Sequence, residues 1–137
     1  MGDPCGNIIE EAVNPYAFII LENEIRDTAK ETFGYFASQG VDIVVISGDN
    51  PVTASKVAVR AGINNAENYI DATTLKSRQD IREAITKYTV FGRVVPSQKK
   101  EIIEAYKESG KVVAMTGDGV NDVLALKCAD CSVAMAS

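Results

Sequence analysis

The densest group of reactive side chains lies in a loop, Thr116 to Asp122, with the sequence T-G-D-G-V-N-D. Asp118, Asn121 and Asp122 bring several oxygen atoms to one point, and Mg²⁺ prefers such hard ligands together with water and phosphate. The glycines partly match a dinucleotide-binding pattern, but Asp122 occupies the third glycine position, where a carboxylate would repel a pyrophosphate. The loop therefore predicts a magnesium site and argues against a dinucleotide site.

A second loop, Ser47-Gly48-Asp49-Asn50, combines a hydroxyl group with a glycine and a helix that follows. Glycine lets the backbone approach a ligand closely, and the free N–H groups at a helix N-terminus favour an anion. The same residue types are also common in ordinary turns. By itself this loop fits a phosphate site and a simple turn equally well.

Lys99 and Lys100 lie in the first turn of the helix that follows Pro96. A cation is unfavourable there, because the helix macrodipole places partial positive charge at that end. A lysine here could reach a phosphoryl group, or the two could form a solvated pair on a surface helix. Considered by themselves, the two lysines favour the solvated pair.

The composition excludes several kinds of chemistry. The 137 residues include no histidine, which rules out catalysis by Ser-His or Cys-His pairs and histidine-bound zinc. We interpret Cys128 and Cys131 as small buried residues rather than a redox or metal pair, since the only other cysteine is Cys5. A net charge of -5 argues against nucleic acid. The apolar runs are too short to cross a membrane, so we expect a cytosolic chain.

The elements that must position these loops alternate between apolar runs and helical patterns. With 46% hydrophobic and 24% charged residues, this alternation is typical of a single α/β domain: a doubly wound, mainly parallel sheet with helices on its faces. Strands are predicted over residues 16–21, 41–47, 88–95, 111–115 and 131–135, with 41–47 and 111–115 buried. Helices are predicted over residues 24–39, 77–85 and 123–128, from Pro51 to a stop at Gly62, and from Pro96 to a stop at Gly110. Both loops then lie at the carboxyl ends of strands, where such sheets bind ligands.

Four segments of the chain resemble the motifs of one family. Ser47, a lysine after Pro96 and the acidic loop follow the motif order of the haloacid-dehalogenase-like phosphotransferases, and the sequence is more similar to their P-type ATPase branch, the cation pumps that form a phosphoenzyme. The segments are V-I-S-G-D-N-P-V-T from Val45, V-F-G-R-V-V-P-S-Q-K from Val90, A-M-T-G-D-G-V-N-D from Ala114 and A-L-K-C-A-D-C-S-V-A-M from Ala125. The resemblance implies a haloacid-dehalogenase-like, Rossmann-like fold.

The resemblance assigns catalytic roles to residues in both loops. It implies that Ser47 and the Gly48 amide hydrogen-bond the phosphoryl oxygens, and that Lys99 neutralises charge on the phosphoryl group. It implies that Asp118 coordinates Mg²⁺, with Asp122 as a second metal position.

Three further residues match family positions around this centre. Asn121, with Asp122, is expected to support the metal ligand and the phosphate environment. Asp49 and Arg93 match positions near the nucleotide, so the implied cofactors are Mg²⁺ and ATP.

Several family features do not occur in the sequence. The phosphorylated aspartate lies in a D-K-T-G-T segment after a hydrophobic strand, and neither Asp3 nor Asp71 has that context. A nucleotide-binding domain and membrane helices are not found either. We therefore expect residues 1–137 to be the carboxyl-terminal part of a pump's phosphorylation domain. Such a chain is inactive alone, works beside nucleotide-binding, actuator and membrane domains, and belongs to the cytosolic side of a membrane protein.

Smaller departures bear on subtype. Val123-Leu124 replaces the usual Ala-Pro, and Gly92 replaces an alanine. Val120 favours a calcium, sodium or proton pump over a heavy-metal pump, and we prefer calcium.

The resemblance also implies that the sheet is incomplete at its centre. In this family the strand with the phosphorylated aspartate lies between the strands that end at Ser47 and Met115. Without it, those strands pair directly, or residues 7–13 enter between them, or a second chain supplies a strand, which would allow self-association.

Two other functions fit the same motifs. One is a soluble phosphatase of the same superfamily, which needs its own nucleophilic aspartate, and the other is a non-catalytic phosphate-binding module. A phospho-receiver module is excluded, because there the acidic residues precede the hydroxyl group and the lysine, whereas here they come last.

Overall fold

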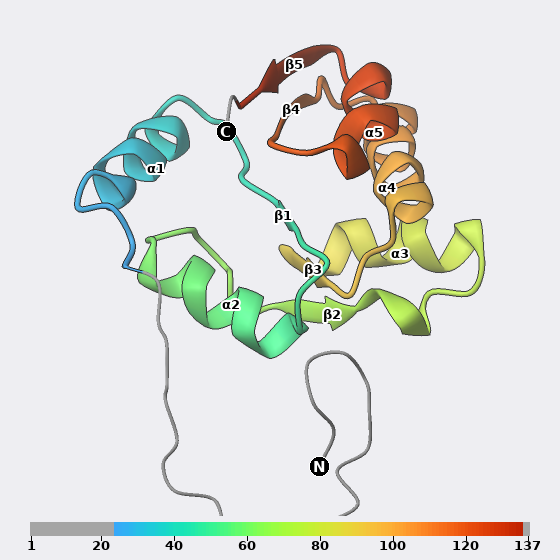
Figure 1. The fold of residues 1–137 in the computed structure, drawn as a ribbon, viewed down its shortest axis with the longest axis horizontal. Coiled ribbons are helices and arrows are strands. Elements are labelled where there is room, and N and C mark those ends of the chain that lie inside the picture. The colour runs from blue at the N-terminus through green and yellow to red at the C-terminus, as the bar shows by residue number, and fades with distance from the viewer. Residues whose placement is uncertain (1–23, 136–137) are drawn as a thin grey trace, which may run out of the picture.

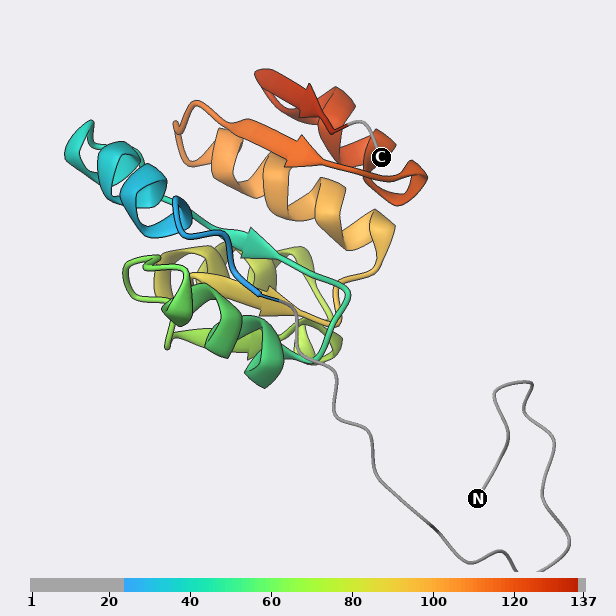
Figure 2. The same cartoon turned by 60° about the vertical axis from the view of Figure 1, so that its left-hand side comes forward.

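The computed structural model describes residues 24–135, in which helices and strands alternate (Figure 1). The strands of this part form two parallel sheets. One has the order β1 (Val45–Ile46), β3 (Val90–Gly92), β2 (Tyr69–Asp71), and the other pairs β4 (Ala114–Gly117) with β5 (Cys131–Ala134). The α-helices are α1 (Ala29–Ser38), α2 (Pro51–Arg60), α3 (Arg78–Lys87), α4 (Pro96–Glu108) and α5 (Val123–Cys128). In Figure 2 the arrows of both sheets point the same way, so their carboxyl ends face one side.

The three-stranded sheet carries the core, with helices on both of its faces. Successive residues of β3 point to opposite faces, as in any strand. Val90 packs with Ala54 and Ala58 of α2, and Phe91 packs with Ile81 of α3 and Ile102 of α4. The predicted α/β class with parallel strands and helices on both faces is therefore confirmed.

Local sequence signals define the helix boundaries. The Asn50 side chain caps α2 by accepting from the N–H of Val52, and Pro51 occupies the first turn. Ser77 and Asp80 form a capping box at the start of α3. The predicted stops of α2 and α4 are confirmed: Gly62 and Gly110 have φ of 85° and 86°, which glycine adopts without strain.

The strands are shorter and more exposed than predicted. β1 spans only Val45–Ile46 of the expected 41–47, and β4 spans Ala114–Gly117 instead of 111–115. Neither strand is buried, because each is the edge strand of its sheet. The predicted strand over 16–21 lies outside the described residues.

Two elements in the middle of the chain were not predicted. They are β2 and the 3-10 helix η1 (Ala72–Thr74) that follows it, and a three-residue strand is too short to show alternation. Beside them, Ser55 of α2 is buried, and its hydroxyl donates to the Ala66 carbonyl at 2.7 Å.

The two sheets do not join in the described part of the chain. β1 and β4 belong to different sheets, so the predicted direct pairing of these strands is wrong. Figure 1 shows α4 on the same side as α3 and α5, next to the space that separates β1 from β4. Insertion of a strand between them stays a prediction, and residues 7–13 lie outside the described residues.

An ionic contact fixes the β4–β5 pair to the end of α4. Asp130 accepts from the backbone N–H of Val113 at 2.9 Å, and its other oxygen pairs with Lys107 of α4 at 3.0 Å. The hydrogen bond from Val113 is the largest of the effects that lower the pKa of Asp130, and Lys107 adds to it.

Gly92 at the end of β3 allows the start of α2 to approach closely. A Cβ atom on Gly92 would lie 2.3 Å from Cα of Pro51 and 2.5 Å from its nitrogen. Both atoms are backbone, so a methyl group would require the chain to move. This contact accounts for a glycine at position 92.

Replacing Gly92 by alanine should therefore destabilise the fold by about 1 to 3 kcal/mol, because overpacking against backbone is costly. Gly34 in α1 is the matched control, since a Cβ there meets nothing within 4 Å. Gly34→Ala should stabilise by roughly 0.5 to 1 kcal/mol through helix propensity. Urea unfolding of both variants measures the two changes, and a Gly92→Ala variant as stable as the wild type would contradict the contact.

The Asp130 contact should make stability pH-dependent. A lowered carboxyl pKa contributes stability above the unfolded-state value, about 3.9 for aspartate, and that stability is lost as the pH falls through the lower folded-state pKa. Asp130→Ala should therefore lower the urea midpoint at pH 7, and the difference from wild type should shrink in acid. Glu67→Ala, at an exposed carboxylate, should show no such pattern. A difference of constant size across this range would refute the contribution of Asp130.

Candidate functional site

The Ser47 loop is joined by hydrogen bonds to the end of β3. The Ser47 carbonyl accepts from the N–H of Val94 at 3.0 Å, and the Asp49 carbonyl accepts from the N–H of Arg93 at 2.7 Å. The Ser47 hydroxyl oxygen accepts from the N–H of Asp49 at 3.1 Å, which leaves its own proton for another acceptor. A Cβ on Gly48 would have only a carbonyl at 3.8 Å as a neighbour, so a ligand can approach the backbone there.

Lys99 and Asp122 form an ion pair shielded from water. Lys99 Nζ lies 2.6 Å from Asp122 Oδ1, and the side chains are 14% and 10% exposed. Asp122 also lies against β4, since a Cβ on Gly117 would be 2.7 Å from the Asp122 Cβ. The neighbouring Lys100 is 44% exposed and pairs with Glu104 of α4 at 3.6 Å. Of the two interpretations of this lysine pair, the solvated one thus describes Lys100 and not Lys99.

The two predicted metal ligands, Asp118 and Asp122, differ in exposure and in their partners. Asp118 follows the last residue of β4 and is exposed, and its side chain makes no hydrogen bond within residues 24–135. Asp122 has one oxygen on Lys99 and is buried. Mg²⁺ commonly binds one or two carboxylates with waters and substrate phosphates. The available donors therefore fit a magnesium ion held mainly by Asp118.

The predicted nucleotide residues lie next to each other but differ in their partners. Asp49 is exposed. Arg93 has a φ of 53°, an unusual value for a residue with a side chain, and its Nη1 donates to Asp71 Oδ2 at 2.6 Å.

Asp71 is the residue of this site that sequence reasoning missed. It ends β2, opposite Gly92 in the register of the sheet, and its Oδ1 accepts from the N–H and the hydroxyl of Thr73. The Thr73 hydroxyl is the largest cause of the lowered pKa of Asp71, and Arg93 contributes less. The spacing of Asp71 and Thr73 is that of an Asx-turn or cap, a signal that could have indicated an ordered carboxylate.

The predicted site residues thus form two groups at the carboxyl ends of the strands. Ser47, Gly48, Asp49 and Arg93 belong to the three-stranded sheet. Lys99 joins α4 to Asp122, in the same loop as Asp118 and Asn121. Lys99 and Asp122 are in direct contact, and the contacts of Ser47 stay within its own group.

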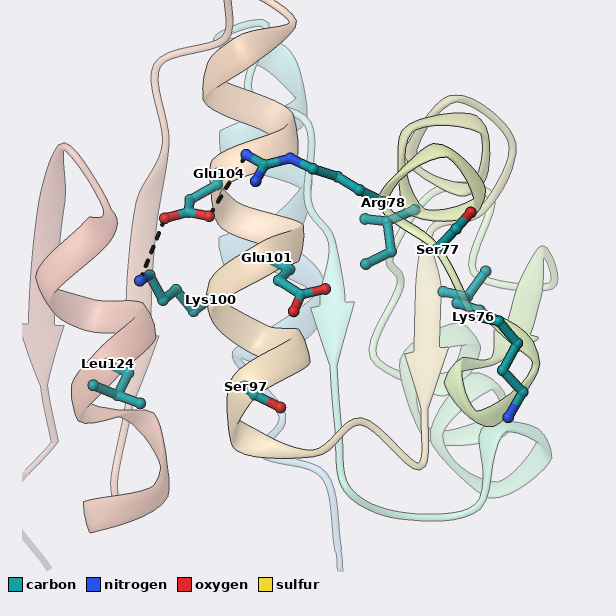
Figure 3. A pocket seen from close by; sticks show the side chains of 10 residues that line it. Lys76, Ser77, Arg78, Ser97, Lys100, Glu101, Glu104 and Leu124 are labelled. Carbon is teal, nitrogen blue, oxygen red and sulfur yellow. Dashed lines mark ion pairs between the residues drawn. The ribbon is translucent and has the colours of Figure 1, made fainter.

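The structure also contains cavities that are not this site. One of about 660 Å³ lies between the starts of α3 and α4 and reaches Leu124 of α5 (Figure 3). Two of its cations share one carboxylate, because Glu104 pairs with both Arg78 and Lys100. Another, of about 750 Å³, is lined partly by the loops that precede the strands.

The cysteines give no sign of a metal centre. Cys128 is half-buried and Cys131 is exposed, and both are free thiols, so the prediction that both are buried is wrong. Within residues 24–135 no cluster of three or more histidine, cysteine or acidic side chains has a geometry that could hold a metal.

Known proteins resemble this chain over nearly its whole length. The family model for haloacid dehalogenase-like hydrolases matches residues 5–130. The calcium-transporting ATPase CtpE of Mycobacterium tuberculosis is 49% identical over 126 residues, and the probable cation-transporting ATPase exp7 of Streptococcus pneumoniae is 44% identical over 124. The human calcium-transporting ATPase type 2C member 1 is 40% identical over 116 residues.

The matched region is a small part of those relatives. The alignments cover 91%, 90% and 80% of this chain but only 16%, 16% and 12% of the three pumps. None of the helices within residues 24–135 has the length and hydropathy that a membrane span requires.

The ion pair predicts different effects for the two adjacent lysines. Lys99→Met should destabilise the fold by about 3 kcal/mol, because it leaves the Asp122 carboxylate shielded without a partner. Lys100→Met should change stability by less than about 1 kcal/mol, since exposed pairs contribute little. Chemical unfolding of the two variants gives the comparison, and equal losses would show that the burial of Lys99 has no energetic consequence.

Proposed function

Because this chain belongs to the haloacid dehalogenase-like hydrolase family, we propose that it forms part of the phosphorylation domain of an ATP-driven cation pump. The observation that carries the proposal is the shielded Lys99–Asp122 pair beside the exposed Asp118. A lysine held in the first turn of α4 by a loop that also carries an exposed carboxylate suits the neutralisation of a phosphoryl group in the presence of a metal ion. The resemblance to cation pumps supports the same conclusion.

Ser47, Gly48 and Lys99 bind the phosphoryl group in this proposal. The Ser47 hydroxyl keeps its proton available, and the open Gly48 backbone lets an oxygen atom approach. Lys99 is oriented by Asp122, so its ammonium group is already in place before a substrate binds. Such pre-positioned donors stabilise developing charge without reorganising.

Asp118 is the main protein ligand of Mg²⁺ in this proposal. The ion would supply charge neutralisation at the phosphate oxygens. The main role of Asp122 is to orient Lys99. Its second role is to coordinate the ion, and Asn121 supports the metal ligands. A chain with one fully available carboxylate should hold Mg²⁺ weakly unless phosphate also binds.

Asp49 and Arg93 form the nucleotide side of the site. They are adjacent through the hydrogen bond from the Arg93 N–H to the Asp49 carbonyl. Arg93 has five N–H donors, and the contact with Asp71 uses one nitrogen. The guanidinium group therefore keeps donors for ATP.

The partners in this proposal are the nucleotide-binding, actuator and membrane domains of the pump, and the chain lies on the cytosolic side. A strand from outside residues 24–135 supplies the phosphorylated aspartate and enters between β1 and β4, whose outer edges have no strand partner among the described residues. In an isolated chain the same edges favour self-association. Calcium is the ion we propose, in line with the names of two of the relatives.

A soluble phosphatase is the second candidate, because it shares the family. It requires an aspartate nucleophile within its own chain. Asp71, the described one of the two aspartates compared with that nucleophile, lacks its sequence context and has both oxygens engaged by Thr73 and Arg93, which favours the pump.

The test is phosphoenzyme formation from labelled ATP and Mg²⁺. The isolated chain should retain no acid-stable label, whereas the full-length protein that contains it should be labelled on an aspartate outside residues 24–135. In that protein, Lys99→Ala and Asp118→Ala should reduce labelling by about 100-fold, because each removes charge stabilisation at the phosphoryl group.

Lys100→Ala is the matched control and should label like the wild type, since Lys100 pairs only with Glu104 at the surface. Label on the isolated chain would support the phosphatase instead. Full labelling of the Asp118→Ala protein would refute the metal assignment.

A further inference from the structure

Arg93 is held in an unfavourable backbone conformation immediately after β3. Its φ of 53° lies in the left-handed region, which a residue with a side chain adopts only when its surroundings hold it there. Its N–H donates to the Asp49 carbonyl at 2.7 Å, and the next N–H, of Val94, donates to the Ser47 carbonyl at 3.0 Å. These two bonds attach Arg93 to the loop proposed to bind phosphate.

The side chain of Arg93 has a single ionic partner in the described part of the chain. Arg93 Nη1 lies 2.6 Å from Oδ2 of Asp71, and the two side chains are 51% and 22% exposed. Asp71 ends β2 in register with Gly92. The contact therefore links the carboxyl ends of two adjacent strands, and the arginine is the more accessible of the two groups.

The carboxylate of Asp71 is itself fixed. Its Oδ1 accepts from the N–H of Thr73 at 3.0 Å and from the Thr73 hydroxyl at 2.6 Å, so Oδ2 is the oxygen turned to Arg93. The bonds from Thr73 also lower the pKa of Asp71, which keeps the group ionised at neutral pH. Asp71 thus presents a charged oxygen in one orientation.

We propose that Asp71 is a positioning residue that holds the Arg93 guanidinium at the nucleotide side of the site, so that its remaining N–H groups meet oxygens of a nucleoside triphosphate. This inference rests on the proposed function. A fixed arginine recognises phosphate oxygens through parallel N–H donors, and it loses less conformational entropy on binding than a mobile one.

The proposal predicts an effect on nucleotide affinity rather than on the chemical step. In the full-length protein, Asp71→Asn should raise the KM for ATP in phosphorylation by about tenfold, the value of one charge-assisted contact. The kcat should stay within about twofold. Asparagine keeps the oxygen that accepts from Thr73, so the turn after β2 is preserved. Glu108→Gln is the matched control, because Glu108 also pairs with arginines but at the far end of α4.

An Arg93→Ala background separates positioning from a structural role. If Asp71 acts through Arg93, Asp71→Asn should have no further effect on KM when Arg93 is already alanine. An undiminished effect there would overturn the proposal, as would an unchanged or lower KM in the single variant, since a lower KM would mean that Asp71 competes with the nucleotide. A wild-type protein without ATP-dependent labelling would overturn the proposed function together with this inference, whereas an active wild type with an insensitive Asp71 would overturn the inference alone.

Discussion

The ion pair between Lys99 and Asp122 is the contact on which the arrangement of the molecule depends. β4 and β5 contribute no buried residue to the core, so the sheet pair they form cannot be placed by its own hydrophobic burial. α4 holds it through this shielded pair at one end, through the Lys107–Asp130 contact at the other, and through the packing of α5. A shielded charge pair stabilises only when its geometry is satisfied, and here that requirement sets the distance between the acidic loop and the main sheet.

The boundaries of several helices could be predicted from the sequence. For the strands, the sequence predicted the approximate position but not the length. Ser77 and Asp80 form a cap within four residues, and α5 begins and ends where its pattern indicated, at Val123 and Cys128. These signals act over one helical turn. The extent of a strand depends on its neighbours instead, and residues 41–44, three of which are β-branched, have no strand beside them in the described part of the chain.

The site was predictable where its residues belong to contiguous motifs. Ser47 and Asp118 stand out by their loops, but spacing by itself favoured a solvated role for Lys99, and only the family resemblance assigned it to the phosphoryl group. Asp71 could not be found in this way, because its contact with Arg93 joins residues 22 positions apart. A pairing of that kind is decided by the register of β2 against β3, which no local pattern reveals.

The separation of the two sheets also divides the chain by local stability. The residues that pack around Val90 and Phe91 run from α2 to α4 and include most of the buried side chains, whereas α1 has none. Segments with few buried contacts open more easily than the core and exchange their amide hydrogens sooner. The acidic loop therefore lies outside the part of the protein that unfolds last, whereas the Ser47 loop is anchored to that part.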